Sequence, residues 1–106
     1  MMKKELTTIA LTAALSHYTL RLYVAGMTPR STIAIANIRA ICGAELEGRC
    51  SLEIIDLYLK PKLAAADQII AVPTLIRNLP SPARRIIGDL SDRGKVLSSL
   101  ELEPKA

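Results

Sequence analysis

The sequence predicts one α/β domain whose strands and helices follow the order β-α-β-α-β-β-α. Three observations support this order: an alternating strand leads into a capped helix, a second strand follows it, and two short strands flank a proline-rich turn. The 106 residues suit one compact core, and 50% of them are hydrophobic. Aromatic residues make up only 3%, so we expect a core of Ile, Leu, Val and Ala.

The first half of the chain predicts a βαβ unit. Apolar and polar residues alternate over 18–25, which is typical of a strand. Thr28 followed by Pro29 favours a helix start, and apolar residues at helical spacing extend that helix over 29–44. A second apolar strand is expected over 51–57. Because one helix separates these strands, we expect them to be parallel with a right-handed crossover.

The second half predicts two helices and a strand pair. We expect a short helix over 61–66, strands over 74–79 and 84–87 around Pro80-Ser81-Pro82, and a helix from Ser91 or Asp92 to about Leu100, before a polar tail from Glu101. This order is that of thioredoxin-like folds. Such folds place a cis-proline where Pro73 stands, although X-Pro bonds are usually trans. We assign 1–17 to an N-terminal extension, 18–103 to the domain and 104–106 to a tail.

The residues argue against an enzyme. A thioredoxin-type oxidoreductase needs a thiol at the start of its first helix, and the turn here reads Met27-Thr28-Pro29-Arg30. Cys42 is expected mid-helix as a buried reduced thiol, and Cys50 is expected to open a strand. His17 is the single histidine, so nucleophilic schemes lack a base. We predict no catalytic residues, no cofactor and no metal site.

Charge and hydropathy limit the partner classes. The net charge of +4 is spread along the chain, whereas nucleic-acid binders usually show a denser basic stripe with aromatics. An acidic protein partner is compatible with this charge, as is a solvated surface of slight basic bias. No segment is long enough to cross a bilayer, and Glu5 argues against a secretory signal in 1–16. We therefore expect a cytoplasmic protein without nucleic-acid or membrane partners.

Several short motifs occur in an order and spacing that are typical of one known family, from about residue 18 to 102. They are Leu22–Gly26 followed by Thr28-Pro29 and Ser31; Ile55-Asp56, Pro61, Leu63-Ala64, Asp67, Ala71 and Pro73–Leu75; and Leu79-Pro80, Pro82, Arg84–Ser91 and Val96-Leu97. Each motif is weak alone, but together they resemble the KaiB family of circadian-clock proteins.

The resemblance implies a regulatory binding protein without a catalytic site. KaiB-like proteins bind the hexameric ATPase KaiC and alter its phosphorylation or ATPase cycle, and in cyanobacteria the bound form captures KaiA. The resemblance also implies a switch between a thioredoxin-like monomer and another packing that forms homodimers or tetramers in the free state. The alternative is a KaiB-like adaptor in stress signalling with a different partner.

The resemblance and the residue chemistry together nominate candidate sites. We expect partner contacts from Tyr18, Arg21, Arg77, Arg84 and Arg85, because arginines are frequent interface hot spots. The alternative is that Arg84 and Arg85 pair internally with Asp89 or Asp92. The candidate fold-switch positions are Pro73, Pro80, Pro82, Gly88, Ser99 and Glu101. For these, the alternative is ordinary loop chemistry in one stable fold.

Some positions depart from the family pattern. Ile33, Glu53 and Gln68 stand where cyanobacterial clock members usually carry basic residues, which weakens an inference of KaiA capture. Ser99 stands where a glycine is typical, and Glu101 where an aspartate is typical. If that glycine adopts a positive φ in one state only, Ser99 would disfavour that state.

Overall fold

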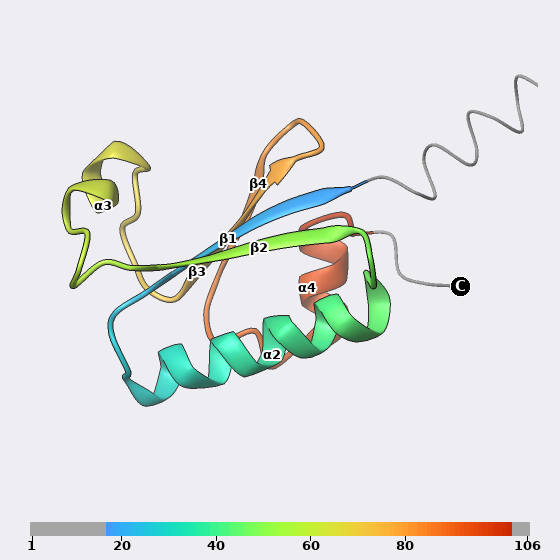
Figure 1. Cartoon of the computed structure of the whole chain (residues 1–106), viewed down its shortest axis with the longest axis horizontal. Helices are drawn as coiled ribbons and strands as arrows, with labels where there is room; N and C mark the ends of the chain where they lie inside the picture. The colour runs from blue at the N-terminus through green and yellow to red at the C-terminus, as the bar shows by residue number, and fades with distance from the viewer. Residues whose placement is uncertain (1–16, 103–106) are drawn as a thin grey trace, which may run out of the picture.

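The computed structural model describes residues 17–102 as one four-stranded sheet with three helices (Figure 1). The elements are β1 Tyr18–Val24, α2 Pro29–Glu45, β2 Cys50–Asp56, α3 Lys62–Ala66, β3 Thr74–Leu79, β4 Arg84–Ile87 and α4 Arg93–Ser99. This confirms the predicted order. The predicted extension, apart from His17, and the predicted tail lie outside the described residues.

The sheet has the strand order β2-β1-β3-β4. β1 pairs parallel with β2, as predicted for the βαβ unit, and antiparallel with β3. β3 and β4 form the predicted antiparallel hairpin. β2 and β4 are therefore the two edges of the sheet, and β1 is internal.

The start of α2 is capped as the sequence predicts. The Thr28 hydroxyl accepts a hydrogen bond from the Ser31 amide at 3.4 Å and donates one to Ser31 Oγ at 2.7 Å. Ser31 Oγ in turn accepts the Ala25 amide at 3.2 Å. These contacts tie the end of β1 to the first turn of α2, and the side chain of Ser31 is buried there.

The strands present two different faces. On one, which we call the helix face, Leu20, Leu22 and Val24 pack against apolar residues of α2 and α4 in the main core. On the other, the α3 face, a smaller cluster of Tyr23, Ile55 and Ile76 packs against residues that include Leu63 of α3. Figure 1 shows α2 and α4 together below the sheet, with α3 lying toward the C-terminal end of β2. Strand alternation produces this division, because successive side chains point to opposite faces.

Several candidate switch positions have unusual backbone geometry. The Val72-Pro73 bond is cis, which confirms the prediction. The bonds preceding Pro80 and Pro82 are also cis, which was not predicted. Gly88 has φ 128°, a value that residues with a Cβ rarely adopt.

The end of α4 forms a Schellman motif. The Glu101 amide donates to the Ser98 carbonyl at 3.1 Å, and the Leu102 amide donates to the Leu97 carbonyl at 2.9 Å. Glu101 has φ 51°, whereas Ser99 is the last helical residue and has no positive φ, so the described structure does not require glycine at position 99. Leu102 is buried against the main core. The predicted polar tail from Glu101 is therefore wrong at Leu102, because the cap turns this side chain inward.

Candidate functional site

The five predicted partner-binding residues do not form one patch. Strand alternation places Arg77 and Arg84, cross-strand partners in the hairpin, on the helix face together with Tyr18. Arg21 and Arg85 point to the α3 face, on either side of Ile76. The two groups therefore face opposite sides of the sheet.

Tyr18 and Arg77 are buried, with 2% and 3% of their surface exposed. Tyr18 belongs to the main core because β1 is an internal strand. The ring of Tyr18 also lies 5.8 Å from the guanidinium carbon of Arg49. Neither Tyr18 nor Arg77 presents its side chain to the surface in the described structure.

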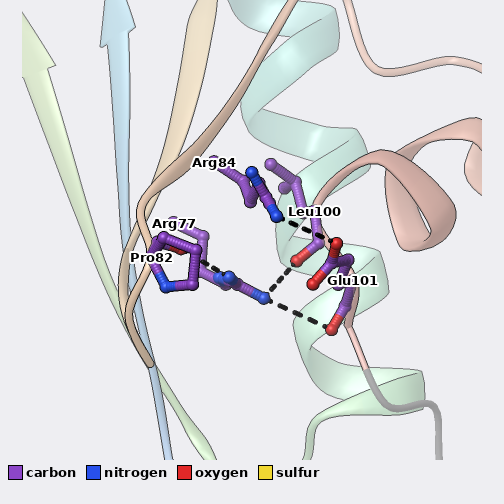
Figure 2. Close-up of polar contacts among 5 residues, drawn as sticks. All are labelled: Arg77, Pro82, Arg84, Leu100 and Glu101. Carbon is purple, nitrogen blue, oxygen red and sulfur yellow. Dashed lines mark hydrogen bonds and ion pairs between the residues drawn. The ribbon is translucent and has the colours of Figure 1, made fainter.

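Arg77 instead joins the hairpin to the end of α4 (Figure 2). Its Nη1 donates to the Leu100 carbonyl at 2.7 Å and, more weakly, to the Glu101 carbonyl at 3.4 Å. Its Nη2 donates to the Pro82 carbonyl at 2.6 Å. A cation at a helix C-terminus satisfies carbonyls that lack helical partners and favourably meets the helix dipole. We call this set of contacts the Arg77 clamp.

Arg84 and Arg85 are exposed on the edge strand β4. Arg84 Nη2 lies 3.3 Å from Glu101 Oε1, and this ion pair is visible beside the clamp in Figure 2. On the opposite face, Arg85 donates to the Gln68 carbonyl at 3.0 Å and to the Asp67 carbonyl at 3.3 Å. Both arginines thus have internal partners, but the partners differ from those considered from sequence.

Asp89 and Asp92 have local roles instead. Asp89 Oδ1 accepts the Ser91 hydroxyl at 2.6 Å and the Ser91 amide at 3.1 Å. Asp92 is the N-cap of α4 and accepts the Lys95 amide at 3.1 Å. The hydrogen bonds from Ser91 hold the pKa of the Asp89 carboxyl below its ordinary value, because they stabilise the ionised form.

Arg21 and Glu53 form an ion pair across the parallel strands. Arg21 Nε lies 3.1 Å from Glu53 Oε1, and the two residues are register partners on β1 and β2. The acidic residue at this departure from the family pattern therefore has a basic partner within the fold. At the other two departures, Ile33 is exposed on α2, and Gln68 has φ 56° with its carbonyl bound by Arg85.

A second polar contact lies on the α3 face. The Tyr23 hydroxyl donates to Asp67 Oδ2 at 2.5 Å, which joins β1 to the residue that ends α3. Burial raises the pKa of Tyr23, and the hydrogen bond that it donates to Asp67 raises it further. This contact and the Arg85 bonds hold the segment after α3 against the sheet.

The surface feature that emerges is the β4 edge, which we define as Arg84–Ile87. Arg84 keeps 43% of its side chain exposed despite its ion pair, and Ile87 is 50% exposed. An edge strand leaves one side of its backbone without a neighbouring strand. The β4 edge therefore combines cationic side chains on both faces with accessible apolar surface.

Metal binding and membrane insertion would each require features of their own. Within 17–102, no three His, Cys, Asp or Glu side chains gather in a way that could hold a metal ion. None of the helices in the same part of the chain is long and apolar enough to cross a membrane.

One signal in the sequence could have shown that Arg84 and Arg85 face opposite sides of the sheet: adjacent residues of a strand point to opposite faces. Sequence reasoning did not find the Glu101 and Arg84 pair or the Arg77 clamp. Both depend on where the end of α4 packs, and no short-range signal encodes this.

Comparison with known proteins identifies relatives over most of the chain. The family model described as KaiB domain matches residues 21–102. A circadian clock oscillator protein KaiB from Prochlorococcus marinus (strain MIT 9312) is 52% identical over 90 residues, covering 85% of this chain and 86% of that protein. The KaiB protein from Synechococcus elongatus (strain ATCC 33912 / PCC 7942 / FACHB-805) is 52% identical over 85 residues, covering 80% and 83%.

Solved structures support the thioredoxin-like fold. Oxidised mitochondrial thioredoxin 3 from Saccharomyces cerevisiae matches with a TM-score of 0.65 at 13% identity, covering 91% of this chain and 88% of that one. The N-terminal domain of SasA from Synechococcus elongatus also matches with a TM-score of 0.65, at 21% identity, covering 86% and 90%. These likenesses concern the fold alone. The family match and the curated relatives support a role in clock regulation, and the chain belongs to the KaiB family.

Proposed function

We propose that this protein is a non-enzymatic regulator that binds a KaiC-type hexameric ATPase through the β4 edge and alters its phosphorylation or ATPase cycle. The observation that carries the proposal is the 52% identity to circadian clock oscillator proteins over 85% of the chain. Within that frame, the β4 edge supplies the exposed arginines that an acidic partner surface would bind. KaiA is not part of the proposal, given the residues at positions 33, 53 and 68.

The chemistry of the β4 edge suits a protein partner. Arg84 and Arg85 each hold only part of their hydrogen-bonding capacity in internal contacts, and a guanidinium has five N–H donors. Ile87 adds apolar area beside them. Interfaces commonly combine a few arginine anchors with a partly apolar centre.

Gel filtration tests the proposal directly. We expect the full chain to comigrate with the KaiC-type ATPase of the same organism when nucleotide is present. The double variant Arg84→Ala/Arg85→Ala should bind at least about 10-fold more weakly, which corresponds to about 1.4 kcal/mol, a modest loss for two interface arginines. The control is Arg39→Ala/Lys62→Ala, which removes two exposed positive charges outside β4 and lowers the net charge equally.

The two variants separate the possible outcomes. Equal weakening in both would show that net charge, and not the β4 edge, drives binding. Wild-type binding by the β4 variant would refute the assignment of partner binding to the β4 edge. If the unmodified protein does not comigrate with the ATPase at all, the partner assignment itself is wrong. Circular dichroism spectra that match the wild type exclude misfolding as the cause.

We further propose that the C-terminal half can repack into a second state while the βαβ half persists. The Arg77 clamp supports this location, because all its contacts join segments of the C-terminal half to one another. An amide NMR spectrum of the free protein should show two slowly exchanging peak sets after about residue 57. A single set of peaks for the whole chain, unchanged by the ATPase, would contradict both switching and binding.

A further inference from the structure

The two cysteines of this chain meet in space, at a distance from the β4 edge. Cys42 lies in the last turn of α2 and Cys50 is the first residue of β2, and the turn between them brings their sulfur atoms to 2.8 Å. β2 and β4 are opposite edges of the sheet. The sequence placed Cys42 mid-helix as a buried thiol, but the structure leaves both cysteines only half-buried.

We propose that Cys42 and Cys50 are a redox-active dithiol that forms a reversible intramolecular disulfide, linking the end of α2 to the start of β2. Their sulfur atoms are about 0.8 Å farther apart than a covalent S–S bond, so small side-chain rotations close the gap. Partial exposure lets a small oxidant reach the pair. This goes beyond the proposed partner binding and does not depend on it.

A metal site would be the other use of a thiol pair. Structural zinc needs four ligands, and the part of the chain that the structure describes contains no group of three His, Cys, Asp or Glu that could hold an ion. Thioredoxin-type catalysis needs a thiol at the N-terminal end of a helix, and Cys42 lies at the C-terminal end of α2. The pair therefore does not match that chemistry. A disulfide is the chemistry that two isolated, facing thiols supply.

The two thiols are not equivalent. Cys42 lies at the C-terminal end of α2, where the helix dipole disfavours an anion. The two sulfur atoms share a hydrogen bond in which either thiol can donate. This contact raises the pKa of Cys42 and lowers the pKa of Cys50, in the same sense as the helix end. Cys50 is therefore the attacking thiolate, and Cys42 is the resolving thiol.

The oxidant in the proposed reaction is a low-molecular-weight disulfide such as glutathione disulfide. The Cys50 thiolate attacks one glutathione sulfur, forms a mixed disulfide and expels one glutathione thiolate. Cys42 then loses its proton and attacks Cys50 Sγ, which forms the Cys42–Cys50 bond and expels the second glutathione thiolate. The protein loses two electrons and two protons, and one glutathione disulfide becomes two reduced glutathione molecules.

Intact mass spectrometry of the full chain tests this assignment. The protein is equilibrated with set ratios of glutathione disulfide to reduced glutathione, quenched with acid and treated with a thiol-alkylating reagent. Because the chain has only two cysteines, an intramolecular disulfide can only join Cys42 to Cys50. We expect two forms, doubly alkylated and unalkylated, with the second replacing the first as the ratio rises and reverting with dithiothreitol.

Single-thiol variants provide the control. Cys42→Ser and Cys50→Ser should each accumulate one glutathione adduct. The Cys50 thiol of Cys42→Ser should react faster than the Cys42 thiol of Cys50→Ser, because only Cys42 lies at the C-terminal end of a helix. The inference is wrong if wild-type protein stays doubly alkylated at every ratio, or if it accumulates glutathione adducts or covalent dimers in place of the unalkylated monomer. Equal rates in the two variants would overturn the roles assigned to the thiols. The wild-type measurement stands even if a variant fails to fold.

Discussion

Replacing Arg77 by methionine tests whether the clamp stabilises the C-terminal half. Methionine keeps an unbranched apolar stem of similar length but donates no hydrogen bonds. The change removes two short bonds, to the carbonyls of Leu100 and Pro82, and a long one to Glu101. Pro82 is exposed, so water can replace the guanidinium at its carbonyl. Leu100 is fully buried, and its carbonyl is left without this partner.

The expected loss follows from these differences. A hydrogen bond involving a charged group contributes about 1.5–3 kcal/mol, and an unpaired buried carbonyl costs about 1–3 kcal/mol. Against this, methionine avoids the cost of burying a charge whose Nε has no hydrogen-bond partner among the described residues. We expect Arg77→Met to lower the free energy of unfolding by about 2–3 kcal/mol. The melting temperature should fall by roughly 10 °C or more.

Urea denaturation followed by far-UV circular dichroism measures this change, since the chain has no tryptophan for fluorescence. Arg77→Lys should recover part of the loss, because one ammonium group cannot span the two main carbonyls. The matched control is Arg84→Met, which removes a half-exposed ion pair with Glu101 and should cost less than about 1 kcal/mol. The reasoning fails if Arg77→Met costs less than about 1 kcal/mol, or no more than Arg84→Met.

Three further predictions concern backbone geometry, capping and charge. Gly88→Ala should destabilise the protein by about 2 kcal/mol, because the φ of Gly88 is 128°. Gly43 lies in α2 with open space around it, so Gly43→Ala should stabilise the protein by about 0.5–1 kcal/mol. Urea denaturation curves that shift in the same direction for both variants would contradict this. Thr28→Ala should cost about 1 kcal/mol in the same assay, and Thr28→Ser should restore most of it; an unaffected Ala variant would exclude the cap as a stabilising contact. The NMR titration midpoint of the Asp89 carboxyl should lie below the ordinary aspartate range, and Ser91→Ala should raise it. Since the pKa of Asp89 is lower in the folded state, any stability from this carboxyl is present above the unfolded pKa and is lost as the pH falls through the folded pKa. A titration midpoint that Ser91→Ala does not move would refute the hydrogen bonds from Ser91 as the cause of the low pKa.

Local chemistry made much of the fold predictable. Thr28 and Pro29 mark the start of α2 because a hydroxyl and a fixed φ satisfy requirements that lie within a few residues. The period-two alternation that predicted β1 and its two faces is also a signal among neighbouring residues. The order of elements then follows from the spacing of such local signals.

The candidate site was less predictable. The residue types were informative, since Arg84 and Arg85 do lie exposed on an edge strand. The sequence did not indicate which of the candidate side chains are buried, because Tyr18 and Arg77 lie in strands whose neighbours come from elsewhere in the chain. An arginine can point to solvent or satisfy buried carbonyls, and the choice depends on long-range packing.

The sequence by itself determined the element order, the family and the absence of a thiol at the start of α2. All three depend on residue identity and short spacing. Only the tertiary structure decided that Arg77 clamps the hairpin to α4, that Arg84 and Arg85 face opposite ways into different contacts, and that Cys42 meets Cys50. The physical reason is that these contacts require segments to be brought together by packing of the core, and packing is a property of the whole chain.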